Sequence, residues 1–76
     1  MNLEDLIAEV LYVESSTIND ESGPENIEAW DSLGHINIIT AIEDEFDIEI
    51  EPEEIAEISK VRDIKTLLTK KQILLD

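Results

Sequence analysis

Residues 30–35 read Trp30-Asp31-Ser32-Leu33-Gly34-His35 and stand at a predicted boundary between a loop and a helix. The stretch before them, from about residue 14 to 31, is rich in Ser, Asn, Asp, Gly and Pro, the residue types that form turns and loops. The stretch after them repeats apolar residues at intervals of three and four, which predicts a helix from Ser32 to about Phe46. Asp31 is the expected N-cap, so Ser32 is predicted to be the first helical residue.

The same periodicity predicts which faces of the first two helices are buried. The expected inner face of the 32–46 helix is a stripe of Ile36, Ile39, Ile42 and Phe46, with Ile38 at its margin and Leu33 well off it. A preceding helix is expected at residues 3–11, with Asn2 as its N-cap. Its apolar face comprises Leu3, Leu6, Ile7, Val10 and Leu11.

Two shorter helices are predicted in the last third of the chain. Pro52 suits the first position of a short third helix, whose buried residues would be Ile55 and Ile58. Ser59 is the expected cap of a fourth helix, whose apolar face comprises Val61, Ile64, Leu67 and Leu68. The side chains expected to anchor the long loop on the core are Ile18, Ile27 and Trp30. The predicted fold is all-α: a single domain spanning residues 1–76, a small four-helix bundle with a long first loop and a short third helix.

Charge narrows the classes of partner. Five Lys and Arg face twenty Asp and Glu in 76 residues, a net charge of −15, which disfavours nucleic acid and anionic lipid surfaces. Basic patches on other proteins are the expected contacts. The chain has no cysteine, which fits a reducing cytoplasm. It shows neither a signal peptide nor an apolar run that spans a membrane. We therefore expect a cytoplasmic monomer that does not insert into membranes.

With these elements in place, the chain resembles the acyl carrier protein family. The signature of that family is Asp-Ser-Leu at the start of the second helix, matched here by Asp31, Ser32 and Leu33, and residues 41–50 and Pro52 are also similar. The resemblance implies that a separate phosphopantetheinyl transferase attaches 4′-phosphopantetheine from coenzyme A to Ser32. A phosphodiester on Ser32 would also lie at a helix N-terminus, where free N–H groups and the positive end of the helix dipole favour an anion.

The resemblance further implies what the chain does and what it contacts. It would be a carrier without catalytic activity of its own, holding acyl groups as thioesters for enzymes of fatty acid, lipid or polyketide-type biosynthesis. In the family, acidic residues of the second helix dock onto basic patches of these enzymes, and Glu43 and Asp44 match that pattern. Leu33 and Ile36 match apolar contact positions near the arm.

The chain departs from carriers of central fatty acid synthesis at Gly34 and Asn37, where those carriers usually have acids. This departure favours a specialised discrete carrier that serves a dedicated set of enzymes. An aminoacyl or peptidyl carrier is an alternative function. An unmodified acidic module for protein interactions is another alternative, from a different class.

The residues do not predict a hydrolytic site or a metal site. Ser32 and His35 are three residues apart and can share a helix face, as a hydrolytic pair would. No third catalytic group, oxyanion-hole signature or room for a substrate cleft accompanies them, so no catalytic residue is predicted. The acidic stretch at residues 19–24 breaks the ligand spacing of an EF-hand, so no metal site is predicted.

Overall fold

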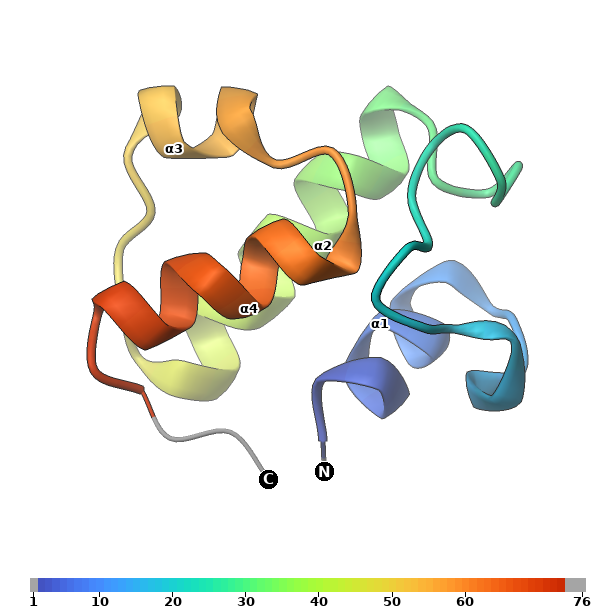
Figure 1. Cartoon of the computed structure of the whole chain (residues 1–76), viewed down its shortest axis with the longest axis horizontal. Helices are drawn as coiled ribbons and strands as arrows, with labels where there is room; N and C mark the ends of the chain where they lie inside the picture. Colours follow the sequence, from blue (N-terminus) through green and yellow to red (C-terminus); the bar gives the residue numbers. More distant parts are fainter. Residues whose placement is uncertain (1, 74–76) are drawn as a thin grey trace.

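The computed structural model describes residues 2–73, in which helices joined by loops pack around a shared core (Figure 1). Its α-helices are α1 (Leu3–Leu11), α2 (Ser32–Phe46), α3 (Pro52–Glu57) and α4 (Val61–Lys70), with a single 3₁₀ turn, η1 (Ser15–Thr17), in the first loop. The predicted all-α fold is confirmed, including the long first loop and the short third helix. Within the described residues, no helix combines the length and the apolar character that a membrane span requires.

The first two helices begin where the sequence predicts, because each has a side-chain cap. The Oδ1 atom of Asn2 accepts a hydrogen bond from the N–H of Asp5 at 2.8 Å, and the Oδ1 atom of Asp31 accepts one from Gly34 at 2.8 Å. Each bond satisfies an N–H group that has no carbonyl partner within its helix. Ser32 is therefore fixed as the first residue of α2 by the residue before it.

The buried face of α2 differs from the predicted stripe. Its buried residues are Gly34, Ile38, Ile39 and Ile42. Ile36, expected on the inner face, has 51% of its surface exposed, while Ile38 has only 1% exposed. The reason is tertiary: Leu11 of α1 and the end of the first loop cover the side of α2 that carries Gly34, which moves the buried stripe toward Ile38.

The start of α4 is also built differently from the prediction. The cap residue is Lys60, not Ser59, and the side chain of Lys60 forms no hydrogen bond with the helix start. Instead, the N–H and the hydroxyl of Ser59 both donate to the carboxylate of Asp63, each at 2.9 Å. The N–H groups of Val61 and Arg62 at the helix start donate to loop carbonyls, those of Ser22 and Asp20, each at 2.9 Å. Asp63 anchors the residue before the cap through its bonds with Ser59. These bonds hold the pKa of Asp63 below its usual value.

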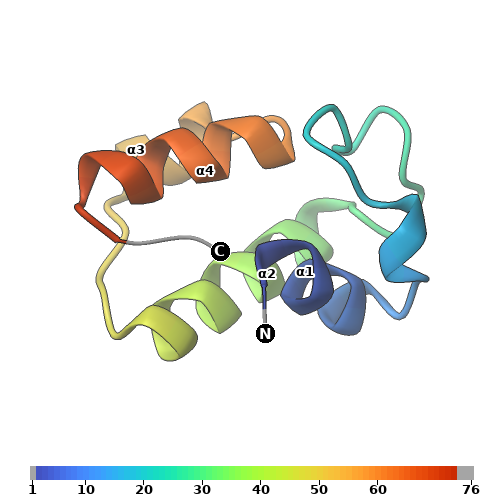
Figure 2. The same cartoon turned by 60° about the horizontal axis from the view of Figure 1, so that its bottom comes forward.

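The first loop is folded onto the core and the start of α4 (Figure 2). As predicted, Ile18 and Trp30 are buried, and Ile27 packs against the core. The N–H of Val61 donates to the carbonyl of Ser22 at 2.9 Å. The Lys65 ammonium lies 2.7 Å from carboxylate oxygens of Asp20, in the loop, and Glu4, in α1; their hydrogen bonds raise the pKa of Lys65. The loop is therefore an ordered part of the fold.

Apolar side chains from α1, α2 and α4 complete the core. The most completely buried of them are Ile7, Ile38, Ile42, Val61, Ile64 and Leu68, each with less than 2% of its surface exposed. The predicted apolar face of α4 is confirmed. The short α3 contributes less, since Ile55 is only partly buried and the fully buried Ile58 lies just beyond its end.

Candidate phosphopantetheine site

Ser32 lies exposed at the N-terminal end of α2, at the edge of an apolar groove of about 800 Å³. The groove is formed by three segments: the end of the first loop, the start of α2, and α3 with the residue after it. Its lining residues are Pro24, Glu28, Trp30, Asp31, Ser32, His35, Ile36, Ile55, Ala56 and Ile58. Leu33 points away from the core, with 69% of its surface exposed. An enzyme can therefore approach Ser32 from solvent.

The surroundings of Ser32 suit a phosphodiester. Asp31 accepts a hydrogen bond from the N–H of Gly34. The N–H groups of Ser32 and Leu33, earlier in the same turn, have no carbonyl acceptor inside the helix. These groups and the positive end of the dipole of a 15-residue helix favour an anion at this place. The exposed position leaves room for a long arm to extend into solvent or along the groove.

His35 lines the groove, and both of its ring nitrogens are engaged in hydrogen bonds. Its Nδ1 accepts from the indole N–H of Trp30 at 3.0 Å, and its Nε2 lies 3.1 Å from the carbonyl oxygen of Ile55 in α3. An indole N–H can only donate, so Nδ1 of His35 accepts. The ring proton is therefore on Nε2, which donates a hydrogen bond to the carbonyl oxygen of Ile55. Neither ring nitrogen is available to take a proton from Ser32. The geometry therefore argues against a Ser32–His35 hydrolytic pair.

Gly34 is buried where the first loop approaches α2 most closely. A Cβ atom at this position would lie 2.5 Å from the carbonyl oxygen of Ala29 and 3.1 Å from Cδ2 of Leu11. No side chain fits there without a shift of the backbone. Gly34, which departs from the family pattern, is therefore required by the packing of the first loop, α1 and α2. An acid at position 34 is incompatible with this structure.

The two predicted acidic docking residues differ in their surroundings. Asp44 is exposed, as a contact residue should be. Glu43 is half-buried, and its Oε2 atom accepts a hydrogen bond from the N–H of Ile50 at 2.8 Å. Glu43 therefore holds the linker between α2 and α3, a structural role that the sequence analysis missed. We regard Asp44 as the cleaner candidate for a contact with partners.

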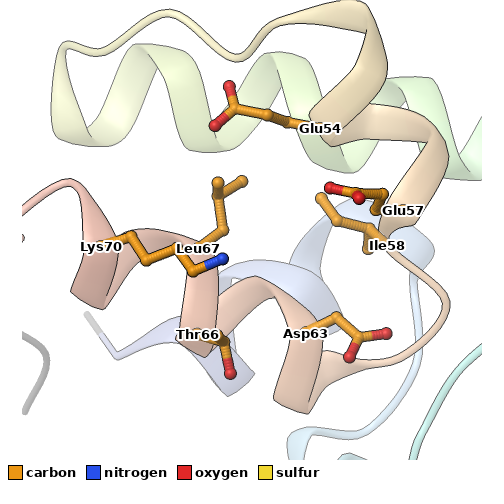
Figure 3. A pocket seen from close by; sticks show the side chains of 7 residues that line it. All are labelled: Glu54, Glu57, Ile58, Asp63, Thr66, Leu67 and Lys70. Carbon is orange, nitrogen blue, oxygen red and sulfur yellow. The ribbon is translucent and has the colours of Figure 1, made fainter.

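A second hollow, of about 240 Å³, lies between α3 and α4 (Figure 3). It is lined by Glu54, Glu57, Ile58, Asp63, Thr66, Leu67 and Lys70. None of the predicted site residues lines it, and its Asp63 is already bonded to Ser59. Within residues 2–73, no group of three or more metal-ligating side chains converges.

Comparisons with known proteins identify the family of the chain. The family model described as "Phosphopantetheine attachment site" matches residues 2–68. An acyl carrier protein of Clostridium acetobutylicum is 37% identical over 62 residues, which cover 82% of this chain and 80% of the relative. The chain belongs to the acyl carrier protein family. An acyl carrier protein of Bdellovibrio bacteriovorus is also similar, 32% identical over 69 residues that cover 91% of this chain and 88% of the relative.

The fold of the family is confirmed by a solved structure. The solution structure of a holo acyl carrier protein from Geobacter metallireducens matches with a TM-score of 0.82 and 30% identity, covering 92% of this chain and 80% of that one. The cofactor of this chain is accordingly 4′-phosphopantetheine. The exposed helix start at Ser32 fits such a group, because it offers a hydroxyl, free N–H groups and open space together.

Proposed function

We propose that this acyl carrier protein carries its 4′-phosphopantetheine on Ser32. The arm supplies a thiol that holds acyl groups as thioesters. Ser32 contributes the hydroxyl that becomes the phosphodiester oxygen, Asp31 fixes the helix start beneath it, and the exposed Leu33 is available to the transferase. The observation that carries the proposal is the exposure of Ser32 at a capped helix N-terminus beside an apolar groove.

The other serines of the chain lack this combination. Ser22 is buried, with 3% of its surface exposed, and its hydroxyl is bonded within the loop. The hydroxyl of Ser59 donates to Asp63. Ser15 and Ser16 lie in the short 3₁₀ turn, which is too short for a helix dipole of the strength found in α2. Ser32 is therefore the best acceptor that the described fold provides.

The test is transfer of phosphopantetheine from coenzyme A by a broad-specificity transferase, followed by intact-mass measurement. The unaltered chain should gain the mass of one phosphopantetheine, and Ser32→Ala should gain none. Ser59→Ala is the matched control, since it removes another serine hydroxyl near a helix start and should still be modified. Modification of Ser32→Ala would show that the site assignment is wrong.

We propose that partner enzymes dock on α2 with a basic patch on their own surface. All the Lys and Arg of the chain fall between residues 60 and 71. Ion pairs to α1, the first loop and α3 engage Lys60, Arg62, Lys65 and Lys71. None of α1, α2 and α3 contains Lys or Arg, and α2 is the one of these helices that carries Ser32, so the acids at positions 43–45 would steer a basic partner toward the helix of the modified serine.

The partners we propose are dedicated enzymes of a specialised pathway. The first turn of α2 contains no acid, Gly34 leaves no room for one, and the exposed Asn37 is neutral. Enzymes that recognise acids near the arm would therefore lose contacts here. This reasoning supports a carrier of acyl intermediates outside central fatty acid synthesis.

A further inference from the structure

The groove beside Ser32 depends on one side chain that joins all three of its segments. His35 belongs to the start of α2, its Nδ1 is bonded to Trp30 at the end of the first loop, and its Nε2 is bonded to Ile55 of α3. The rings of Trp30 and His35 lie with their centroids 6.2 Å apart, and Trp30 has only 1% of its surface exposed. One end of the bridge is therefore anchored in the core, and the other holds α3.

The remaining attachments of α3 are modest. The helix has six residues, and none of them is fully buried. Its first turn is closed by its own capping box, which stabilises the helix without fixing it to a neighbour. On the side toward α4, Glu54 forms an ion pair with Lys71 at 3.2 Å; both side chains are partly exposed to solvent, which weakens the pair. Ile58, just after the helix, supplies the main apolar anchor.

The bond from His35 is thus the polar attachment that fixes α3 on the side of Ser32. Without it, the groove wall formed by Ile55 and Ala56 is held by the packing of Ile55 on the core, by Ile58 and by the Glu54–Lys71 ion pair, none of which bonds α3 to the start of α2. The hollow between α3 and α4 is lined on the α3 side by Glu54 and Glu57, whereas the groove beside Ser32 is lined by Ile55 and Ala56 (Figure 3).

We propose that His35 is a positioning residue that holds α3 beside Ser32, so that α3 forms part of the surface contacted by the enzyme that modifies Ser32. This proposal rests on the proposed function of Ser32. A displaced α3 would weaken docking without altering the serine, so the loss should appear in KM and leave kcat unchanged.

The two bonds of His35 can be separated by substitution. The amide of Asn reaches the position of Nδ1, so His35→Asn can still accept from Trp30 but cannot reach Ile55. The amide of Gln reaches the position of Nε2, so His35→Gln can still donate to Ile55. His35→Leu removes both bonds. The decisive comparison is between Asn and Gln, which are matched in chemistry and differ in which segment they hold.

The experiment measures KM and kcat for phosphopantetheine transfer to each variant, at a temperature where circular dichroism shows all of them folded. We expect His35→Asn and His35→Leu to raise KM about tenfold, equivalent to about 1.4 kcal/mol of docking free energy. His35→Gln should stay close to the unaltered chain. Amide NMR signals of residues 52–57 in the unmodified protein should move in the Asn and Leu variants and stay in place in the Gln variant.

Lys71→Gln is the control, because it releases α3 on the side away from Ser32 and should leave KM unchanged. Equal KM values for the Asn and Gln variants, or a KM for Lys71→Gln raised as much as for His35→Asn, would overturn the proposal. The same holds if α3 signals move while KM does not. Modification of Ser32→Ala would instead refute the proposed function, so the two failures are distinguishable.

Discussion

Gly34 gives the most direct test of the packing around the site. In Gly34→Ala, the new Cβ atom would lie 2.5 Å from the carbonyl oxygen of Ala29, so the loop or the helix must move. Overpacking of this kind costs about 1–3 kcal/mol. The better helix propensity of alanine offsets roughly 1 kcal/mol of that cost. Because the clash is with backbone and not with the end of a flexible side chain, we take the upper part of that range, about 2–3 kcal/mol, which leaves a net destabilisation of about 1–2 kcal/mol.

The assay is thermal unfolding followed by circular dichroism, with Thr40→Ala as the matched control. For a domain of this size, each kcal/mol shifts Tm by about 4–8 °C, so Gly34→Ala should lower Tm by roughly 5–15 °C. Thr40 is exposed on the same helix, and its replacement by alanine should leave Tm unchanged or raise it slightly. A Gly34→Ala variant as stable as the control would refute the close approach of loop and helix.

Four other substitutions test the site and the start of α4. Glu43→Ala should lose about 1.5–3 kcal/mol of stability, as removal of a hydrogen bond to a charged group does; Asp44→Lys should instead slow association with the true partner at low salt and leave Tm nearly unchanged. The pKa of Asp63 is held below its usual value of 3.8 by the N–H and hydroxyl of Ser59, so its contribution is full above pH 3.8 and is lost as pH falls through the lower folded pKa. Asp63→Asn should therefore lower Tm at neutral pH, and the difference from the unaltered chain should close in stronger acid. Asn37→Glu should improve turnover of the holo-protein by enzymes of central fatty acid synthesis, and high salt should erase the gain; equal turnover by both proteins would contradict the specialised assignment.

Local signals explain why the sequence predicts the four helices and the starts of the first three. Asn2, Asp31 and Pro52 act within one turn of their own positions, so their effects do not depend on the rest of the fold. The same locality made Ser32 recognisable as the first residue of α2.

Features that depend on distant segments were harder to predict. Four isoleucines at positions 36, 38, 39 and 42 fit more than one helix face, and only the approach of α1 and the first loop selects the buried one. The bond from His35 to Ile55 joins residues twenty positions apart, and the bond from Glu43 to Ile50 depends on the path of a linker. Gly34 did carry a signal, since a glycine in the first turn of a helix indicates a close approach of backbone.

Ser32 as the point of attachment is the claim on which the rest of the account depends. The most direct measurement is fragmentation mass spectrometry of the intact holo-protein, after coexpression with a broad-specificity phosphopantetheinyl transferase. The account predicts that every fragment containing residue 32 carries the added mass, and that fragments ending at Asp31 or beginning at Leu33 carry none. Added mass on fragments that exclude Ser32, or a chain that stays unmodified throughout, would contradict it.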